Sequence, residues 1–437
     1  MSRAKECRFV ATGDSLISRR LPEGDEATQA LGRLIGQSDF RFTNLETVVR
    51  TWEEGFPSAQ SGGTWTSATP EMLDDLKRYQ FNALAWATNH TLDYSYGGLE
   101  ATRRYLDRAG VVHAGAGLNL AEASAVRYLE TAQGRVALIS GTSSAHESWV
   151  AGEARPDVAG RPGINPLGYS TMVLVTAEQL RHLRDVAHDY AVNAKHEISV
   201  RGGFTLPDAE GVVRLGSLLF REAKEGETPG LVTRMSQKDW KRFQKRIDEA
   251  KRQSDFVVVS IHAHEMKGRD NTQPADFLVE FARACIDQGA DAVVGHGPHR
   301  VRGIEIYKGR PIFYSLGNFI FQNESVERLP ADFYEKYGLG AEHTVADAFK
   351  TRNGNDTKGL GVQPDIWESV VAEWEMRDGK LHSITLHPIS LGFDEPAYRR
   401  GWPRLSNNLH VLEDLQQLSR PFGTELCIEN GVAVWRA

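Results

Sequence analysis

Four short apolar runs, each ending abruptly in a cluster of polar residues, constrain the fold of this 437-residue chain more than any other feature. The runs occupy residues 9–11, 83–87, 256–261 and 292–295. Their length and β-branched character predict buried β-strands. Because segments with helical patterns lie between them, we expect an α/β sheet, in which ligands gather beyond the carboxyl ends of the strands.

Capping signals predict three helices between the strands. One begins at Thr69–Pro70, an N-cap followed by proline at the first helical position. A second ends at Gly110, and a third runs from near Pro274 to Gly289. The alternation of strands and helices thus continues along most of the chain.

Two regions depart from this alternation within what we expect to be a single domain, residues 1–437. Glycine, proline and charged residues dominate residues 143–235. We expect a long insertion over the site there, with a helix around 177–194, because long irregular segments of compact domains are often functional. Residues 366–437 are expected to add antiparallel strands and a helix, with a hairpin turn at Arg377–Lys380.

Composition excludes several classes of partner. The net charge of -7 gives no electrostatic reason to bind nucleic acid or an anionic membrane. The three cysteines, Cys7, Cys285 and Cys427, are far apart, which argues against a disulfide framework and favours a reducing compartment. The chain shows neither a signal peptide nor a run of roughly 18 apolar residues. We therefore expect a cytoplasmic protein that binds no nucleic acid and no membrane.

The polar clusters contain the side-chain types that bind divalent metals. They are Asp14, Asn44, Glu46, Asn89, His90, His262, His264, Glu265, His296 and His299. Mixed carboxylate, amide and imidazole groups suit Mn, Fe or Zn, and the lack of thiolates argues against a structural zinc site. Any one of these residues alone is more often a turn or hydrogen-bonded structural residue. Their joint occurrence at successive strand ends predicts a metal site.

The order of the motifs resembles the CapA-like family of capsule-synthesis proteins, a branch of the calcineurin-like metallophosphoesterase superfamily. The matching segments are Gly13–Asp14, Asn44–Glu46, Asn89–His90 with Asp93, His262, Gly295–His299 and Ser315–Phe319. The resemblance implies two packed mixed β-sheets flanked by helices, in the order α-β-β-α. It also implies two divalent metal ions, for which Mn, Zn, Fe and Ca are the candidates.

The resemblance also implies roles for individual residues. The metal-binding positions are Asp14, Glu46, Asn89, His262, His296 and His299. His90 falls on an acid/base position beside the metals, and Asn44 is expected to orient Glu46.

The chain departs from the family pattern beside the metals. It has Thr88 where the family has the first asparagine of Asn-Asn-His, and Gly297 where the family has the second histidine of Gly-His-His-Pro-His. It has Ala263 and His264 where the family has Trp-Gly after the metal-binding histidine. His264 and Glu265 are therefore extra titratable groups beside the site, although His264 could instead cap a loop.

Two reactions fit such a site. Two metals with a nearby histidine can activate water and hydrolyse a phosphate ester. The same positive charge can stabilise the enolate formed when a proton leaves the carbon next to a carbonyl or carboxylate, which requires bases on both faces. Cytosolic members of the CapA-like group encoded with lasso-peptide pathways are peptide epimerases of the second kind. This chain resembles them in its altered motifs, its lengthened middle region and its lack of an export signal.

We therefore expect a metal-dependent epimerase that converts the C-terminal residue of a ribosomal lasso-peptide precursor, a tryptophan, from L to D. The expected bases are His90 and one of His264, Glu265 and His299. A leader-binding protein is a further candidate partner. A metal-dependent phosphoesterase or other hydrolase is the alternative, and a non-catalytic accessory protein of polymer synthesis is a third reading.

Overall fold

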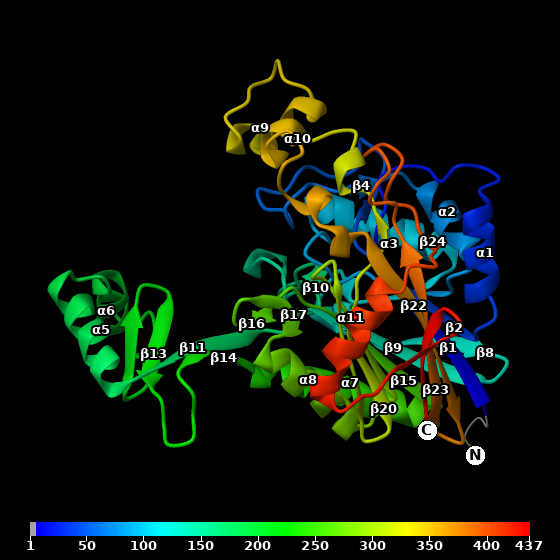
Figure 1. The fold of residues 1–437 in the computed structure, drawn as a ribbon. Helices are drawn as coiled ribbons and strands as arrows, with labels where there is room; N and C mark the ends of the chain where they lie inside the picture. Colours follow the sequence, from blue (N-terminus) through cyan, green and yellow to red (C-terminus); the bar gives the residue numbers. More distant parts are fainter. Residues whose placement is uncertain (1–5) are drawn as a thin grey trace.

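Two large β-sheets form the centre of the computed structural model, which describes residues 6–437 (Figure 1). Four smaller sheets and a set of helices surround them. The predicted mixed α/β class is therefore confirmed.

The larger sheet has ten strands, which come from the N-terminal and the C-terminal parts of the chain. Its strands are β1 (Glu6–Leu16), β2 (Phe40–Leu45), β5 (Ala83–Ala85), β6 (Val112–Ala114), β21 (Asn318–Phe321), β22 (Glu368–Arg377), β23 (Lys380–Ser390), β24 (Arg404–Leu405), β25 (Cys427–Glu429) and β26 (Val432–Arg436). Strands β1, β2, β5 and β6 pair in parallel, and β22 pairs with β1 in the antiparallel sense. The C-terminal strands extend the sheet as antiparallel hairpins, and the turn between β22 and β23 places Asp378 and Gly379 at positive φ.

The second sheet has six strands in the order β19-β20-β18-β15-β9-β8. They are β8 (Arg127–Thr131), β9 (Gly134–Thr142), β15 (Phe256–His262), β18 (Ala292–His296), β19 (Val301–Tyr307) and β20 (Arg310–Leu316). The four central strands pair in parallel, whereas β8 and β19 pair in the antiparallel sense at the two edges.

The two sheets pack face to face around one apolar core. Phe9 and Phe42 from the larger sheet belong to the same buried cluster as Val258 and Val294 from the smaller one. The ring of Phe9 meets that of Phe256 edge-on, with centroids 5.3 Å apart. Burial of this much apolar surface is the main force holding the sheets together.

Helices cover the outer face of each sheet, which gives the layers the order α-β-β-α. On the larger sheet lie α1 (Glu26–Ile35), α2 (Met72–Arg78) and α3 (Ser95–Ala109), and on the smaller sheet lie α7 (Gln237–Gln253) and α8 (Asp276–Gln288). Gly110 and Gly289 end α3 and α8 in the left-handed conformation, as their sequence signals predict. Helix α11 (His410–Ser419) packs against β19 and the inner cluster.

The segment predicted as an irregular insertion contains a small folded unit, residues 169–235, which we call the side lobe. It comprises β11 (Tyr169–Val175), α5 (Ala177–Asp189), α6 (Ala194–Arg201), β12 (Val212–Leu215), β13 (Leu218–Glu222) and β14 (Gly230–Met235). Its four strands form one sheet in the order β12-β13-β11-β14. The lobe projects to one side of the two main sheets (Figure 1). Helix α5 lies where the sequence predicts one.

The remaining elements are short. They are β3 (Val48–Val49), β4 (Ser67–Ala68), β7 (Ala116–Gly117), α4 (Leu120–Ala123), β10 (Gly163–Ile164), β16 (Met266–Lys267), β17 (Asp270–Pro274), α9 (Ala331–Lys336) and α10 (Val345–Asn353), with 3-10 turns at Glu147–Trp149, Asn323–Ser325, Leu360–Val362, Pro364–Ile366 and Arg420–Phe422. Within residues 6–437, no helix combines the length and the apolar character needed to cross a membrane.

A close approach of β1 to the end of β20 fixes the carboxyl end of β1. A Cβ added to Gly13 would lie 2.1 Å from the carbonyl oxygen of Gly317, so only glycine fits without movement of the backbone. The N–H of Asp14 donates to that same carbonyl at 2.9 Å. The register of the sheet also changes between Ala11 and Asp14. Together these features aim the Asp14 side chain at the region where the two sheets end.

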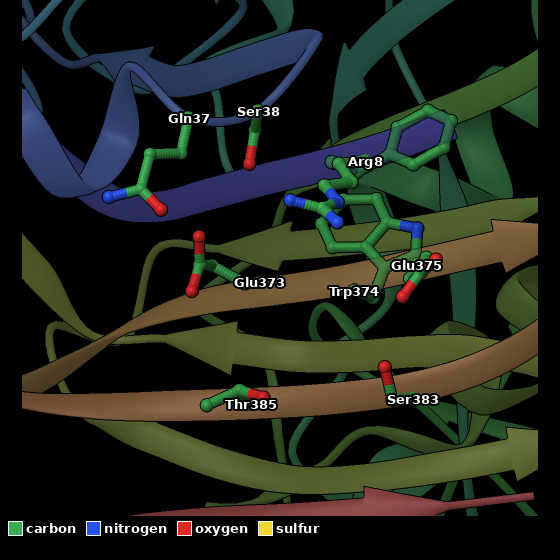
Figure 2. Close-up of a pocket in the computed structure, with 9 residues that line it drawn as sticks. Arg8, Gln37, Ser38, Glu373, Trp374, Glu375, Ser383 and Thr385 are labelled. Atoms are coloured by element: carbon green, nitrogen blue, oxygen red, sulfur yellow. The ribbon is translucent and has the colours of Figure 1, made fainter. Parts of the chain in front are cut away.

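A hollow also lies at the opposite end of β1. Figure 2 shows that Arg8 and Gln37 line it beside Glu373 and Glu375 of β22. Because Arg8 lies near the beginning of this strand and Asp14 lies near its end, the hollow is separate from the polar strand ends described next.

Candidate metal centre

Both sheets contribute polar side chains to one site at their carboxyl ends. From the larger sheet come Asp14 on β1, Asn44 and Glu46 at the end of β2, and Asn89 and His90 after β5. From the smaller sheet come His262 and His264 at the end of β15, and His296 and His299 at the end of β18. Strand register makes Asp14 a direct neighbour of Asn44, and His262 a direct neighbour of His296.

His262 lies at the centre of the site. Its Nε2 lies 2.9 Å from Oδ1 of Asn89, 3.1 Å from Nε2 of His264 and 3.6 Å from Oε1 of Glu46. Its Nδ1 lies 3.6 Å from Oδ1 of Asp14. One imidazole therefore faces potential ligands from three strand ends.

Two carboxylates are fully buried in this site, and their surroundings differ. Oδ2 of Asp14 accepts the N–H of Gly297 at 3.0 Å, and its Oδ1 accepts the Asn44 amide at 2.7 Å. Both oxygens of Glu46 are buried without a hydrogen-bond donor among residues 6–437. Asn44 therefore supports Asp14, and the expected contact with Glu46 is not found.

The pKa values of these two carboxyl groups are driven apart. Burial raises the pKa of Glu46 well above its usual value, and the nearby charges of Asp14 and Asp93 raise it further. Burial opposes ionisation of Asp14 as well, but His262, 3.6 Å away, and the neighbouring imidazoles outweigh that effect and lower its pKa. Two buried carboxylates can both ionise only if a cation joins them.

His296 and His299 approach the carboxylates from β18. The Nε2 of His296 lies 3.2 Å from the carbonyl oxygen of Thr12, and its buried Nδ1 has no partner among the described residues. Burial lowers the pKa of His296 to about 4, so its ring is neutral at pH 7. Burial also lowers the pKa of His299. Neutral imidazoles are the form that binds metals.

Asn318 on β21 holds His299 in an unusual backbone conformation. His299 has a φ of 59°, in the left-handed region that non-glycine residues rarely adopt. Oδ1 of Asn318 lies 2.9 Å from Nδ1 of His299, and the Asn318 amide donates to the His299 carbonyl at 3.2 Å. The Ser315–Phe319 motif was noted in the sequence, but only the structure reveals this contact.

His90 is placed by Asp93 and covered by a glycine loop. The Nδ1 of His90 lies 2.7 Å from Oδ2 of Asp93, which also accepts the N–H of Thr66 at 2.8 Å. Burial raises the pKa of Asp93 against the opposing effect of His90. A Cβ added to Gly62 would lie 2.6 Å from Nε2 of His90. The loop that contains Gly62 thus packs directly on the ring of His90. The Nε2 of this ring lies 3.9 Å from Oε1 of Glu46.

The side chain of Glu265 makes its hydrogen bonds outside the group of side chains that converge on the site. Its Oε2 accepts the hydroxyls of Ser143 and Ser144, at 2.7 and 2.9 Å. The other nine residues predicted from the strand ends converge. Glu265 instead connects the end of β15 to the beginning of the predicted insertion.

The converging side chains fit a divalent cation. Carboxylate oxygens of Glu46 and Nδ1 of His296 are buried and unpaired among residues 6–437, and an ion would satisfy them. Glu46, His264 and His299 each offer a ligand atom, and those three atoms lie within 4.8 Å of one another. Mixed oxygen and imidazole donors suit metals such as Mn, Fe and Zn.

Comparison with known proteins identifies a family. The family described as "Bacterial capsule synthesis protein PGA_cap" matches residues 8–323, which contain all ten predicted site residues. A protein from Sinorhizobium fredii (strain NBRC 101917 / NGR234), named "Uncharacterized protein y4sH", is 38% identical over 98% of this chain and 92% of its own length.

Two further relatives carry names that refer to polymer synthesis. "PGA biosynthesis protein CapA" of Bacillus subtilis (strain 168) is 37% identical over 43% of this chain and 54% of its own. "Probable polyglutamine synthesis accessory protein MT0602" of Mycobacterium tuberculosis (strain CDC 1551 / Oshkosh) is 27% identical over 66% of this chain and 57% of its own. Among solved structures, a hypothetical protein from Thermus thermophilus aligns over 87% of this chain and 98% of its own, with 11% identity and a TM-score of 0.38. At that TM-score the likeness bears on neither fold nor function.

Removing ligands should remove the metal. Asp14→Ala, Asn89→Ala and His296→Ala should each lose bound metal in elemental analysis of the purified protein, because each deletes a converging donor. His410→Ala, which changes an exposed histidine on α11, should retain it. Full metal occupancy in all three site variants would contradict the assignment.

Metal affinity should rise with pH until Glu46 ionises. Because its pKa is raised, Glu46 holds a proton at pH values where an ordinary glutamate has lost it, and an arriving cation must displace that proton. Titration calorimetry in two buffers of different ionisation enthalpy should show about one proton released per site. Glu46→Gln should release fewer protons and bind more weakly; unchanged proton release in that variant would refute the explanation.

Proposed function

The chain belongs to the PGA_cap family of bacterial capsule synthesis proteins, and from this we propose that it is a metal-dependent peptide epimerase. It converts the C-terminal residue of a lasso-peptide precursor, a tryptophan, from L to D. The proposal includes the calcineurin-like metallophosphoesterase fold, which the α-β-β-α order and the site at the strand ends support. It also includes a pair of divalent ions held by Asp14, Glu46, Asn89, His262, His296 and His299.

The observation that carries the proposal is the position of His90. Its ring lies beside Glu46, yet its Nδ1 is engaged by Asp93 at 2.7 Å, which fixes the ring and leaves Nε2 as the nitrogen that can exchange a proton with a substrate. A bound divalent ion supplies positive charge that stabilises the anion formed when Cα loses its proton. His90 would remove or return that proton on one face, a role that contributes about 10²–10⁴-fold in rate.

A second base must act on the opposite face of Cα. The candidates are His264, Glu265 and His299. His264 and His299 each have a possible ligand atom within 4.8 Å of one on Glu46. Glu265 lies outside that cluster and accepts two serine hydroxyls through Oε2, so it is the candidate base that a bound metal ion would leave free.

Two observations support a peptide substrate: the name of one relative, and the position of the insertion at residues 143–235. The name of the mycobacterial relative refers to synthesis of polyglutamine, a polymer of amino acids. The insertion at 143–235 begins at Ser143 and Ser144, whose hydroxyls donate to the carboxylate of Glu265. We infer that this insertion contacts the ribosomal precursor in the cytoplasm, alone or with a leader-binding protein.

Hydrogen exchange can locate the peptide. Addition of precursor peptide to the metal-loaded protein should slow amide exchange within residues 143–235, because binding shields backbone N–H groups from solvent. A peptide of the same composition in scrambled order serves as the control. Protection confined to the C-terminal hairpins of residues 366–437 would place the peptide elsewhere.

The second candidate is a metal-dependent phosphoesterase, which the same donor set and family support. Reaction in D₂O separates the two. An epimerase should place one deuterium on the Cα of the terminal residue and produce a mixture of L and D forms, without cleavage. His90→Ala should retain metal yet lose this exchange, because it removes a base and no ligand.

Turnover of a chromogenic phosphodiester with Mn, together with failure to exchange the peptide proton, would favour the hydrolase. A precursor that is cut, or that inverts without taking up deuterium in either epimer, would rule out the epimerase.

A further inference from the structure

We propose that His264 is a ligand of the bound metal and not a base, joining Glu46 and His299 around the cation. The inference rests on the metal site of the proposed function and deepens it.

The first support is convergence of donor atoms. A ring nitrogen of His264 belongs to the group of three ligand atoms, with Glu46 and His299, that lie within 4.8 Å of one another. Its Nε2 is the nitrogen that faces His262, and it lies 3.1 Å from Nε2 of that residue. The ring packs edge-on against both histidines, with centroids 5.0 Å from His262 and 5.4 Å from His299. Its nitrogen therefore points toward the ligand set.

The second support is the spacing of those atoms. Metal–ligand bonds of about 2.1 Å place neighbouring donors of one coordination sphere about 3.0–3.4 Å apart. Nε2 of His262 lies 2.9 Å from Oδ1 of Asn89 and 3.1 Å from Nε2 of His264. A single ring nitrogen carries at most one proton, so it cannot donate well to both neighbours. One cation among the three atoms would satisfy all of them.

The third support is that the backbone of His264 is fixed on both sides. Its N–H donates to Oγ of Ser144 at 2.6 Å, and its carbonyl accepts from Arg302 at 3.2 Å. The Arg302 side chain is fully buried and also donates to the carbonyls of Ala263 and Asn271, at 3.3 and 3.0 Å. Burying a guanidinium is costly, so these contacts indicate that the loop carrying His264 must be held in place. Fixed geometry is what a ligand requires.

Metal affinity distinguishes a ligand from a base. In competition with a chelator, His264→Ala should bind Mn²⁺ about tenfold or more weakly than the parent protein. Substitution with Co²⁺ should give the variant a changed visible spectrum, because one imidazole has left the coordination sphere. His410→Ala, which removes an exposed histidine of α11 far from this loop in sequence, should change neither measurement.

Unchanged Mn²⁺ affinity and Co²⁺ spectrum in a folded His264→Ala protein would overturn the inference. Should that variant fail to fold, anomalous diffraction from crystals of the Mn²⁺-loaded parent protein decides. A manganese peak about 2.0–2.3 Å from Nε2 of His264 is expected, and a peak beyond bonding distance overturns the inference. A parent protein that binds no metal would instead refute the proposed function itself.

Discussion

The fold buries two carboxylates, Asp14 and Glu46, side by side, and no hydrogen-bond donor among residues 6–437 reaches the oxygens of Glu46. Each comes from the end of a central strand of the larger sheet, and the histidines that oppose them come from the other sheet. Without a cation, one carboxyl group must keep its proton. A divalent cation at this junction would let both carboxylates ionise beside neutral imidazoles.

Placing these groups requires backbone contacts as well as side chains. Gly13 allows β1 to approach Gly317, and the N–H of Gly297 reaches Asp14 from the smaller sheet. Asn318 balances the strain of the left-handed backbone at His299, a conformation that costs about 1–3 kcal/mol. A residue keeps such a strained backbone conformation only when the contacts around it hold it there. Here the contacts come from a strand that belongs to the opposite sheet.

Much of this architecture follows from local sequence. Apolar runs that stop at polar residues marked the strand ends, and glycines marked the ends of α3 and α8. What local sequence could not supply is the direction of a side chain relative to distant segments. Asn44 donates to Asp14 in place of Glu46, and Glu265 reaches Ser143 across 122 positions of sequence. The strands of the side lobe also escaped prediction, because Gly, Pro and charged residues obscure their short periodic segments.

The ligands are spread from Asp14 to His299, so they meet only after both sheets have formed and packed. Apolar contacts such as those of Phe9 with Phe256 hold the sheets together without help from the ion. This differs from a small zinc domain, in which metal capture drives folding. The site would therefore be a preformed receptor for a divalent metal. The fraction of the protein that carries an ion would then depend on the free metal concentration and the affinity of the folded site, and not on the folding step.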